Sequence, residues 1–167
     1  MGVIEYELLL DGERKPVLVK KNSEFSDADD FLDSPSKIAQ MFMVRCNAEY
    51  LPEEHIWMLA LNVKCKPIGM FEVAHGTNRN CMTSPRELFV RACVSGCDCI
   101  AVVHNPSGIC TPSSEDDSLT KRLVEAGGLL GIPVVDHVII GKDSYYSYAE
   151  QNEELLKTKQ DRKERKE

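Results

Sequence analysis

The sequence lacks any apolar run that is long enough to span a membrane as a helix. It also lacks a secretory leader, because Met1–Glu5 has no basic region followed by an apolar one. Gly2 is not followed by Ser or Thr at the position that N-myristoylation requires. These absences predict a cytoplasmic protein with no membrane partner.

Positive charge is also scarce, and paired cysteine motifs are missing. The chain has 20 Lys and Arg against 27 Asp and Glu, which gives a net charge of −7. This charge does not support a nucleic-acid partner, although the Lys-rich C-terminus leaves such contacts open. The seven cysteines are odd in number and contain no Cys-x-x-Cys pair. We therefore expect reduced thiols rather than a disulfide framework.

What the sequence does contain is 167 residues of ordinary globular composition, enough for one domain with a hydrophobic core. Asp11-Gly12 lies between two apolar runs and predicts a hairpin. Ser34-Pro35 predicts the start of a helix after an acidic linker. We interpret residues 1–49 as an N-terminal hairpin and helix extension, and residues 151–167 as a charged C-terminal tail.

Strands and helices alternate through the centre of the chain. The apolar runs His55–Leu61 and Ile68–Ala74 predict two strands that pair in antiparallel fashion, and Cys99–Val103 predicts a buried central strand. A capping box at Ser84–Glu87 begins a helix between the second of these strands and the central strand. A further helix follows Asp116, and the segments 134–140 and 144–148 predict two more strands. The fold class predicted is α/β (α+β), with a mixed, largely antiparallel sheet flanked by helices.

A polar stretch follows the central strand, from His104 to Asp116. Ser113 is a good helix N-cap, and Asp116 suits the first turn of the helix that Ser113 begins. A His at a strand end and an Asp at a helix start can point into one pocket, and both bind divalent metals. The stretch is therefore the candidate functional site.

Several motifs surround this stretch in a fixed order. They are Glu72–Thr77, Pro85–Phe89, His104–Gly108, Thr111–Ser113 with Asp116, Gly131–Gly141 and Tyr146–Glu150. Together they resemble the RadC-like branch of the MPN (JAB, JAMM) metallohydrolases, from about Tyr50 to Glu150. The resemblance implies a RadC-like MPN/JAB domain over residues 50–150, with cytidine-deaminase-like layering of sheet and helices.

The resemblance also implies a zinc-dependent hydrolase of amide, isopeptide or peptide bonds. By this resemblance His104 and Asp116 are metal ligands, Glu72 is the general base and Ser113 is the hydroxyl that stabilises the oxyanion. Each residue also has a structural interpretation: a strand-end His, a first-turn acid, a surface carboxylate and an N-cap. All four residues occur in the order of the family motifs, and this order favours the catalytic interpretation.

The chain departs from the family at one metal ligand. The family reads His-Asn-His-Pro-Ser-Gly, whereas this chain passes from His104-Asn105 directly to Pro106, so one imidazole is missing. Zinc should therefore bind weakly or not at all, since an amide oxygen is a poor zinc ligand. Cys110 and His75 remain open as replacement ligands. His137 is interpreted as structural.

Two functions follow from these observations. The first is a metallohydrolase acting on a peptide or isopeptide substrate that the sequence does not identify. The second is a metal-free MPN scaffold that serves as a DNA-repair-associated or protein-interaction module. The metal content of the purified protein separates the two, and neither the substrate nor the oligomeric state follows from the sequence.

Overall fold

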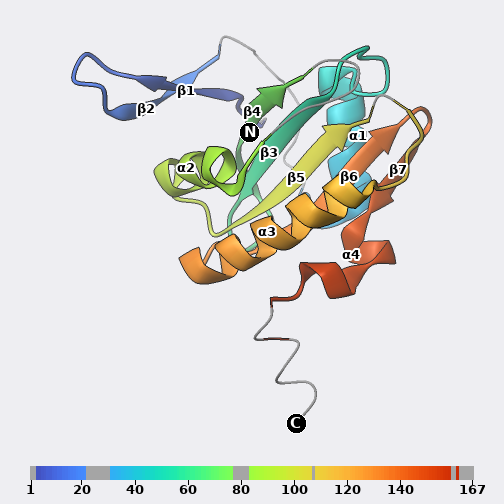
Figure 1. Ribbon diagram of the computed structural model, residues 1–167. Coiled ribbons are helices and arrows are strands. Elements are labelled where there is room, and N and C mark those ends of the chain that lie inside the picture. The colour runs from blue at the N-terminus through green and yellow to red at the C-terminus, as the bar shows by residue number, and fades with distance from the viewer. Residues whose placement is uncertain (1–2, 22–30, 77–82, 107, 159–160, 162–167) are drawn as a thin grey trace.

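A five-stranded sheet with strand order β4-β3-β5-β6-β7 lies at the centre of the molecule (Figure 1). The computed structural model describes residues 3–21, 31–76, 83–106, 108–158 and 161. The strands are β3 (His55–Leu61), β4 (Pro67–His75), β5 (Cys99–Asn105), β6 (Val134–Gly141) and β7 (Ser144–Ser147). Only β5 and β6 pair in parallel, and the other neighbours are antiparallel. The mixed, largely antiparallel sheet predicted from the sequence is confirmed.

Helices cover both faces of this sheet, which explains why its central strands are apolar on both sides. Helix α1 (Pro35–Cys46) packs on one face, where Phe42 contacts Trp57. Helices α2 (Pro85–Ser95) and α3 (Ser114–Leu130) pack on the other. Alternate residues of β3 therefore belong to two separate cores.

Helix α3 is the crossover between the two parallel strands, and its ends are defined by local sequence. Ser113 is its N-cap and accepts a hydrogen bond from the backbone N–H of Asp116, as the sequence predicted. Gly131 ends the helix in the left-handed conformation, with φ of 70°, which a residue without a Cβ adopts at little cost. The crossover places the start of α3 beside the end of β5.

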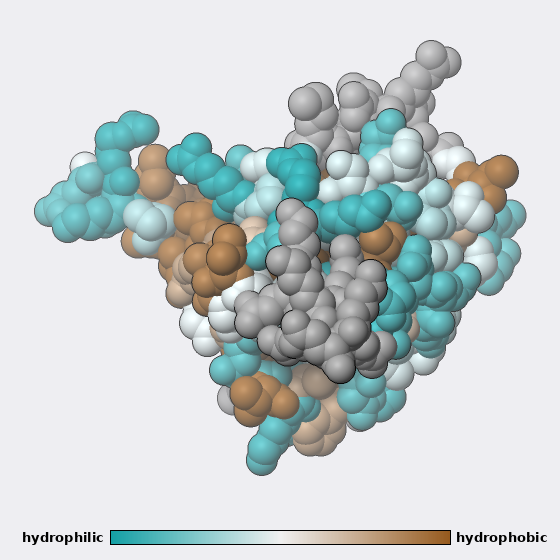
Figure 2. Space-filling view, turned by 60° about the horizontal axis from the view of Figure 1, so that its bottom comes forward, coloured by the Kyte–Doolittle hydropathy of each residue, from teal (hydrophilic) through white to brown (hydrophobic). Residues whose placement is uncertain are grey.

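The N-terminal hairpin of β1 (Tyr6–Leu10) and β2 (Pro16–Lys20) forms a sheet of its own. It joins the edge of the main sheet at β4, where the N–H of Met70 donates to the carbonyl of Ile4. The tip of the hairpin projects from the molecule and is hydrophilic (Figure 2).

Two short elements end the described chain, α4 (Tyr148–Gln151) and the 3₁₀ turn η1 (Glu153–Leu156). None of the helices in the described ranges has the length and apolar character needed to cross a bilayer. Most of the predicted acidic linker, Thr77, Ser107 and most of the last nine residues lie outside the described residues.

Candidate functional site

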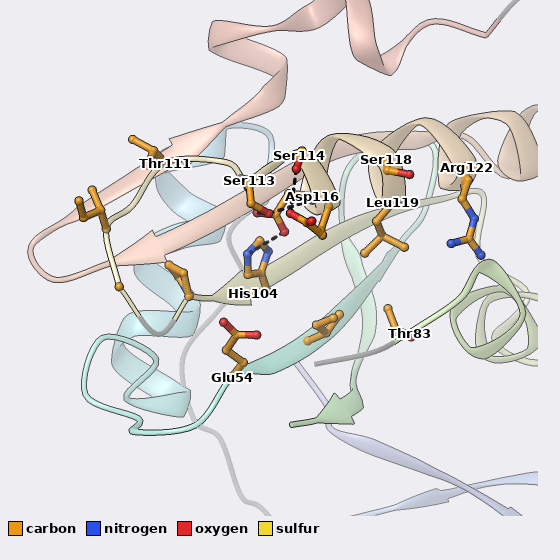
Figure 3. Close-up of a pocket in the computed structure, with 15 residues that line it drawn as sticks. Glu54, Thr83, His104, Thr111, Ser113, Ser114, Asp116, Ser118, Leu119 and Arg122 are labelled. Carbon is orange, nitrogen blue, oxygen red and sulfur yellow. Dashed lines mark hydrogen bonds and ion pairs between the residues drawn. The ribbon is translucent and has the colours of Figure 1, made fainter. Parts of the chain in front are cut away.

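A pocket of about 690 Å³ lies where β5 ends and α3 begins (Figure 3). Its lining comes from Glu54 and Ile56 at the start of β3, Thr83 before α2, the end of β5, the loop before α3 and the first turns of α3. This volume is in the range of ordinary small-molecule and peptide sites. Three of the four residues proposed from the sequence, His104, Ser113 and Asp116, line the pocket.

His104 and Asp116 face each other directly. The Nε2 atom of His104 lies 3.3 Å from Oδ1 of Asp116. The other carboxylate oxygen of Asp116 accepts hydrogen bonds from the Ser113 backbone N–H at 2.8 Å and from the Ser113 hydroxyl at 2.7 Å. Ser113 therefore acts as the N-cap of α3 and orients the Asp116 carboxylate toward His104. In this arrangement its hydroxyl proton is engaged by Asp116.

A buried hydrogen-bond chain holds His104 from behind. The Thr120 hydroxyl donates to the backbone carbonyl of Asp116 at 2.7 Å and lies 2.7 Å from Nδ1 of His137. Because a carbonyl only accepts, the single hydroxyl proton goes to Asp116, and His137 must donate from Nδ1. Nε2 of His137 is then an acceptor for Nδ1–H of His104, 2.8 Å away. The lone pair of His104 Nε2 is thereby directed at the pocket.

Burial reinforces this neutral form of both imidazoles. Desolvation lowers the pKa of His104, and the nearby carboxylates of Asp116 and Glu54 only partly oppose it. Desolvation also lowers the pKa of His137 well below its usual value, and the neighbouring His104 adds to the effect. A neutral imidazole that donates one ring N–H to a partner, here Nδ1–H to His137, and turns the lone pair of its other nitrogen to a pocket has the arrangement of a metal ligand with an outer-shell partner. His137, which sequence analysis interpreted as structural, thus orients His104.

Glu72 does not line the pocket. The pairing of β3 with β4 skips Val73, so that Ala74 lies opposite Ile56 while Glu72 lies opposite Trp57. This register puts Glu72 on the α1 face of the sheet, where its carboxylate accepts a hydrogen bond of 2.6 Å from Nδ1 of His55. The structure therefore does not bring Glu72 to His104 and Asp116, because the two strand positions belong to opposite faces.

Glu54 is the carboxylate that sequence reasoning missed. It lines the pocket, and its side chain points toward His104 (Figure 3). Its charge acts on the His104 imidazole and raises the pKa of that group against the effect of burial. The signal in the sequence was a carboxylate immediately before a strand that pairs with the His-bearing strand, a pairing that the sequence alone does not establish.

Three residues could replace the missing metal ligand on sequence grounds, and none of them lines the pocket. Asn105 points to the opposite face, where its amide donates to the carbonyl of Glu53 and accepts from the N–H of His55. The thiol of Cys110 donates to the carbonyl of Ile139 at 3.2 Å. His75 stacks on His55, with ring centroids 4.0 Å apart.

The donor set in the pocket fits a catalytic zinc ion only in part. A zinc hydrolase site takes three protein ligands and one water. His104 and Asp116 are two suitable ligands with fixed orientation, and the described residues that line the pocket offer no second imidazole or thiolate. Glu54 and Ser113 supply a further carboxylate and a hydroxyl. The described lining of the pocket thus offers one imidazole or thiolate fewer than a catalytic zinc site takes.

Comparison with known proteins gives a consistent picture. A model of the RadC-like JAB domain matches residues 32–154. A UPF0758 protein of Alkaliphilus metalliredigens is 41% identical over 122 residues, which are 72% of this chain and 52% of the relative. A UPF0758 protein of Caldanaerobacter subterraneus is 41% identical over 129 residues, 77% of this chain and 52% of the relative. The chain thus spans about half the length of these curated relatives.

Proposed function

Because this chain belongs to the RadC-like JAB domain family, we propose that its pocket is a metal-assisted hydrolase site for an amide or isopeptide bond. The observation that supports the proposal best is the direct approach of His104 Nε2 to Asp116 Oδ1 in a pocket that also contains Glu54. Two acceptors 3.3 Å apart repel each other unless a proton or a cation lies nearby. A divalent cation satisfies both.

A zinc ion bound there would supply a water whose pKa is lowered to about 7. The residues of the chain would perform the rest of the reaction. His104 and Asp116 would hold the ion, and Ser113 and His137 keep these two side chains in orientation. Glu54 would accept a proton from water in the pocket and return it to the leaving amine, the task of a general acid–base. The substrate is a peptide or isopeptide segment in the cytoplasm.

The competing proposal is a metal-free scaffold that binds DNA-repair or other protein partners. The ligand count favours it, because the described lining of the pocket contains only one imidazole. The engagement of the Ser113 hydroxyl by Asp116 also favours it, since an oxyanion donor would need that proton.

Digestion of a mixed peptide and isopeptide library with excess Zn²⁺, followed by mass spectrometry, tests the proposal. We expect slow cleavage by the unmodified chain and loss of cleavage in Glu54→Gln, which keeps the shape of the side chain but cannot accept the proton. Glu13→Gln on the exposed hairpin turn is the matched control. The absence of any cleavage in the unmodified chain would favour the scaffold. Loss in Glu72→Gln with retention in Glu54→Gln would return the role of base to Glu72.

A further inference from the structure

A second group of metal-ligating side chains lies outside the pocket. Glu53, His55 and His75 each offer one ligand atom, and these atoms all lie within 4.8 Å of one another. In the register of β3 with β5, His55 lies opposite Asn105 and Ile56 lies opposite His104. Because successive side chains of a strand point to opposite faces, His55 is on the α1 face and His104 on the α3 face. The sheet separates the two groups.

We propose that Glu53, His55 and His75 bind a divalent transition-metal ion of the zinc class, at a site distinct from the pocket. Two imidazoles and one carboxylate are a donor set that zinc accepts in tetrahedral sites, with water in the fourth position. Imidazole nitrogen also selects against Mg²⁺ and Ca²⁺, which prefer oxygen ligands. The inference does not depend on the proposed hydrolase function.

The environment of His55 supplies an independent argument. Its Nδ1–H donates to the Glu72 carboxylate at 2.6 Å, which leaves the lone pair on Nε2. Metal-binding histidines almost always donate their second ring N–H to a carboxylate or carbonyl in this way, which fixes the tautomer and increases the basicity of the ligand. Glu72 is thus a positioning residue for the second site.

The backbone that carries these side chains is also fixed before any ion binds. His55 and His75 are directly paired across β3 and β4, and their rings stack at 21°. Asn105 binds the backbone on both sides of residue 54, through the N–H of His55 and the carbonyl of Glu53. Preorganisation of this kind reduces the entropy that binding would otherwise cost.

Access and charge are suitable as well. The His55 side chain is 12% exposed, whereas His75 is exposed at the end of its strand. An ion can therefore enter from solvent on the His75 side. The carboxylates of Glu53 and Glu72 surround the two imidazoles with negative charge, which attracts a cation.

The test is titration of the full chain with Zn²⁺ by calorimetry, together with visible absorption of the Co²⁺-substituted protein. We compare the unmodified chain with His75→Ala, whose side chain is exposed at the end of β4, and with the matched control His104→Ala in the pocket. We expect one tightly bound zinc equivalent in both the unmodified chain and His104→Ala, whereas the two-ligand pocket of the unmodified chain binds zinc only weakly. Glu72→Ala, which removes the outer-shell partner, should weaken this binding about 10- to 100-fold, and His75→Ala, which removes a ligand, should weaken it more than Glu72→Ala does.

Thermal unfolding gives a second readout, because an ion that binds only the folded state raises the melting temperature. Zinc should raise it in the unmodified chain and in His104→Ala, and not in His75→Ala. Zinc binding that is lost in His104→Ala and kept in His75→Ala would overturn the second site and place the ion in the pocket. Failure of the unmodified chain to bind zinc at all would also overturn the proposal, whatever the result of the peptide digestion.

Discussion

At the scale of single residues, the site depends on which atoms donate and which accept. The chain from the Asp116 carbonyl through Thr120 and His137 to His104 has one consistent proton assignment, and it ends with a lone pair in the pocket. On the other face, the hydrogen bond from His55 to Glu72 gives the same result at the second group of ligands. In both cases a hydrogen bond to one ring nitrogen fixes the tautomer, and the lone pair is left on the other ring nitrogen.

Thr120→Val should break the chain behind His104. Valine has nearly the same shape but no hydroxyl, so Nδ1–H of the buried His137 loses its acceptor, and the free energy of unfolding should fall by about 1–3 kcal/mol. Thr120→Ser keeps the hydroxyl and should lose only about 0.8 kcal/mol for the missing methyl group. Urea unfolding of both variants measures the difference. Equal losses in the two variants would show that the hydroxyl does not hold His137.

At the scale of the elements, the pocket is a product of one strand–helix connection. His104 lies at the end of β5. The capping box of Ser113 and Asp116 begins α3 directly after the loop that follows this strand. The residue missing from the family pattern falls between these two elements. Asn105, the last residue of β5, points to the opposite face, so the strand alternation is intact up to the deletion.

Insertion of one His between Asn105 and Pro106 should restore tight zinc binding in the pocket. Continued alternation turns the inserted imidazole to the face of His104, and the ligand count rises from two to three. The experiment belongs in the His75→Ala background, so that zinc at the second group of ligands does not contribute. Calorimetric titration should show clearly tighter binding than in the chain without the insertion. Insertion of Ala at the same place is the control, and equal binding by both insertions would contradict the ligand-count argument.

Asp136 in β6 is hydrogen-bonded to the end of β7 and to α4. From its environment we expect protein stability to depend on pH. Its buried carboxylate accepts hydrogen bonds from the Ser147 hydroxyl and the Ala149 N–H, and burial raises the pKa of Asp136. A raised folded-state pKa contributes stability below the unfolded value of about 3.9, and this contribution is lost as pH rises through the folded value. Asp136→Asn, which carries no charge, should therefore gain stability relative to the unmodified chain as pH rises from 4 to 7.

Urea unfolding across that pH range measures the trend. Asp33→Asn is a control in which the trend should have the opposite sign. The hydrogen bond from Lys37 lowers the pKa of Asp33, so the ionised Asp33 carboxylate stabilises the fold at high pH, and this stability is lost as pH falls. A stability difference between Asp136→Asn and the unmodified chain that stays constant with pH would contradict the assignment.

At the scale of the whole molecule, the sheet separates two cores and two groups of ligands. Helix α1 supplies much of one core, and the family match includes it by beginning at residue 32. The acidic linker before this helix predicts that it belongs to an N-terminal extension over residues 1–49. The side chain of Phe42 is fully buried against the sheet, so α1 belongs to the same packed unit as β3 and β5.

Phe42→Ala should test this integration. Removal of a fully buried aromatic side chain costs about 3–5 kcal/mol, because a cavity remains where the ring packed. Val44→Ala on the same helix is the matched control, since Val44 is 72% exposed and its truncation should change stability little. A single unfolding transition with a large loss in Phe42→Ala is expected. If Phe42→Ala instead unfolded in two steps, with the sheet intact in the first, α1 would be a separate extension.

The local features of this protein can be predicted from the amino-acid sequence alone. Apolar runs predicted β3 and β5, serine caps and Gly131 defined helix ends, and the motif order identified the family, because all of these depend on neighbours along the chain. The tertiary structure decided which side chains meet. The skipped residue Val73 in the pairing of β4 put Glu72 on the α1 face, and the approach of β3 to β5 brought Glu54 to His104. Strand register is a long-range property, and a shift of one residue exchanges the faces of a strand.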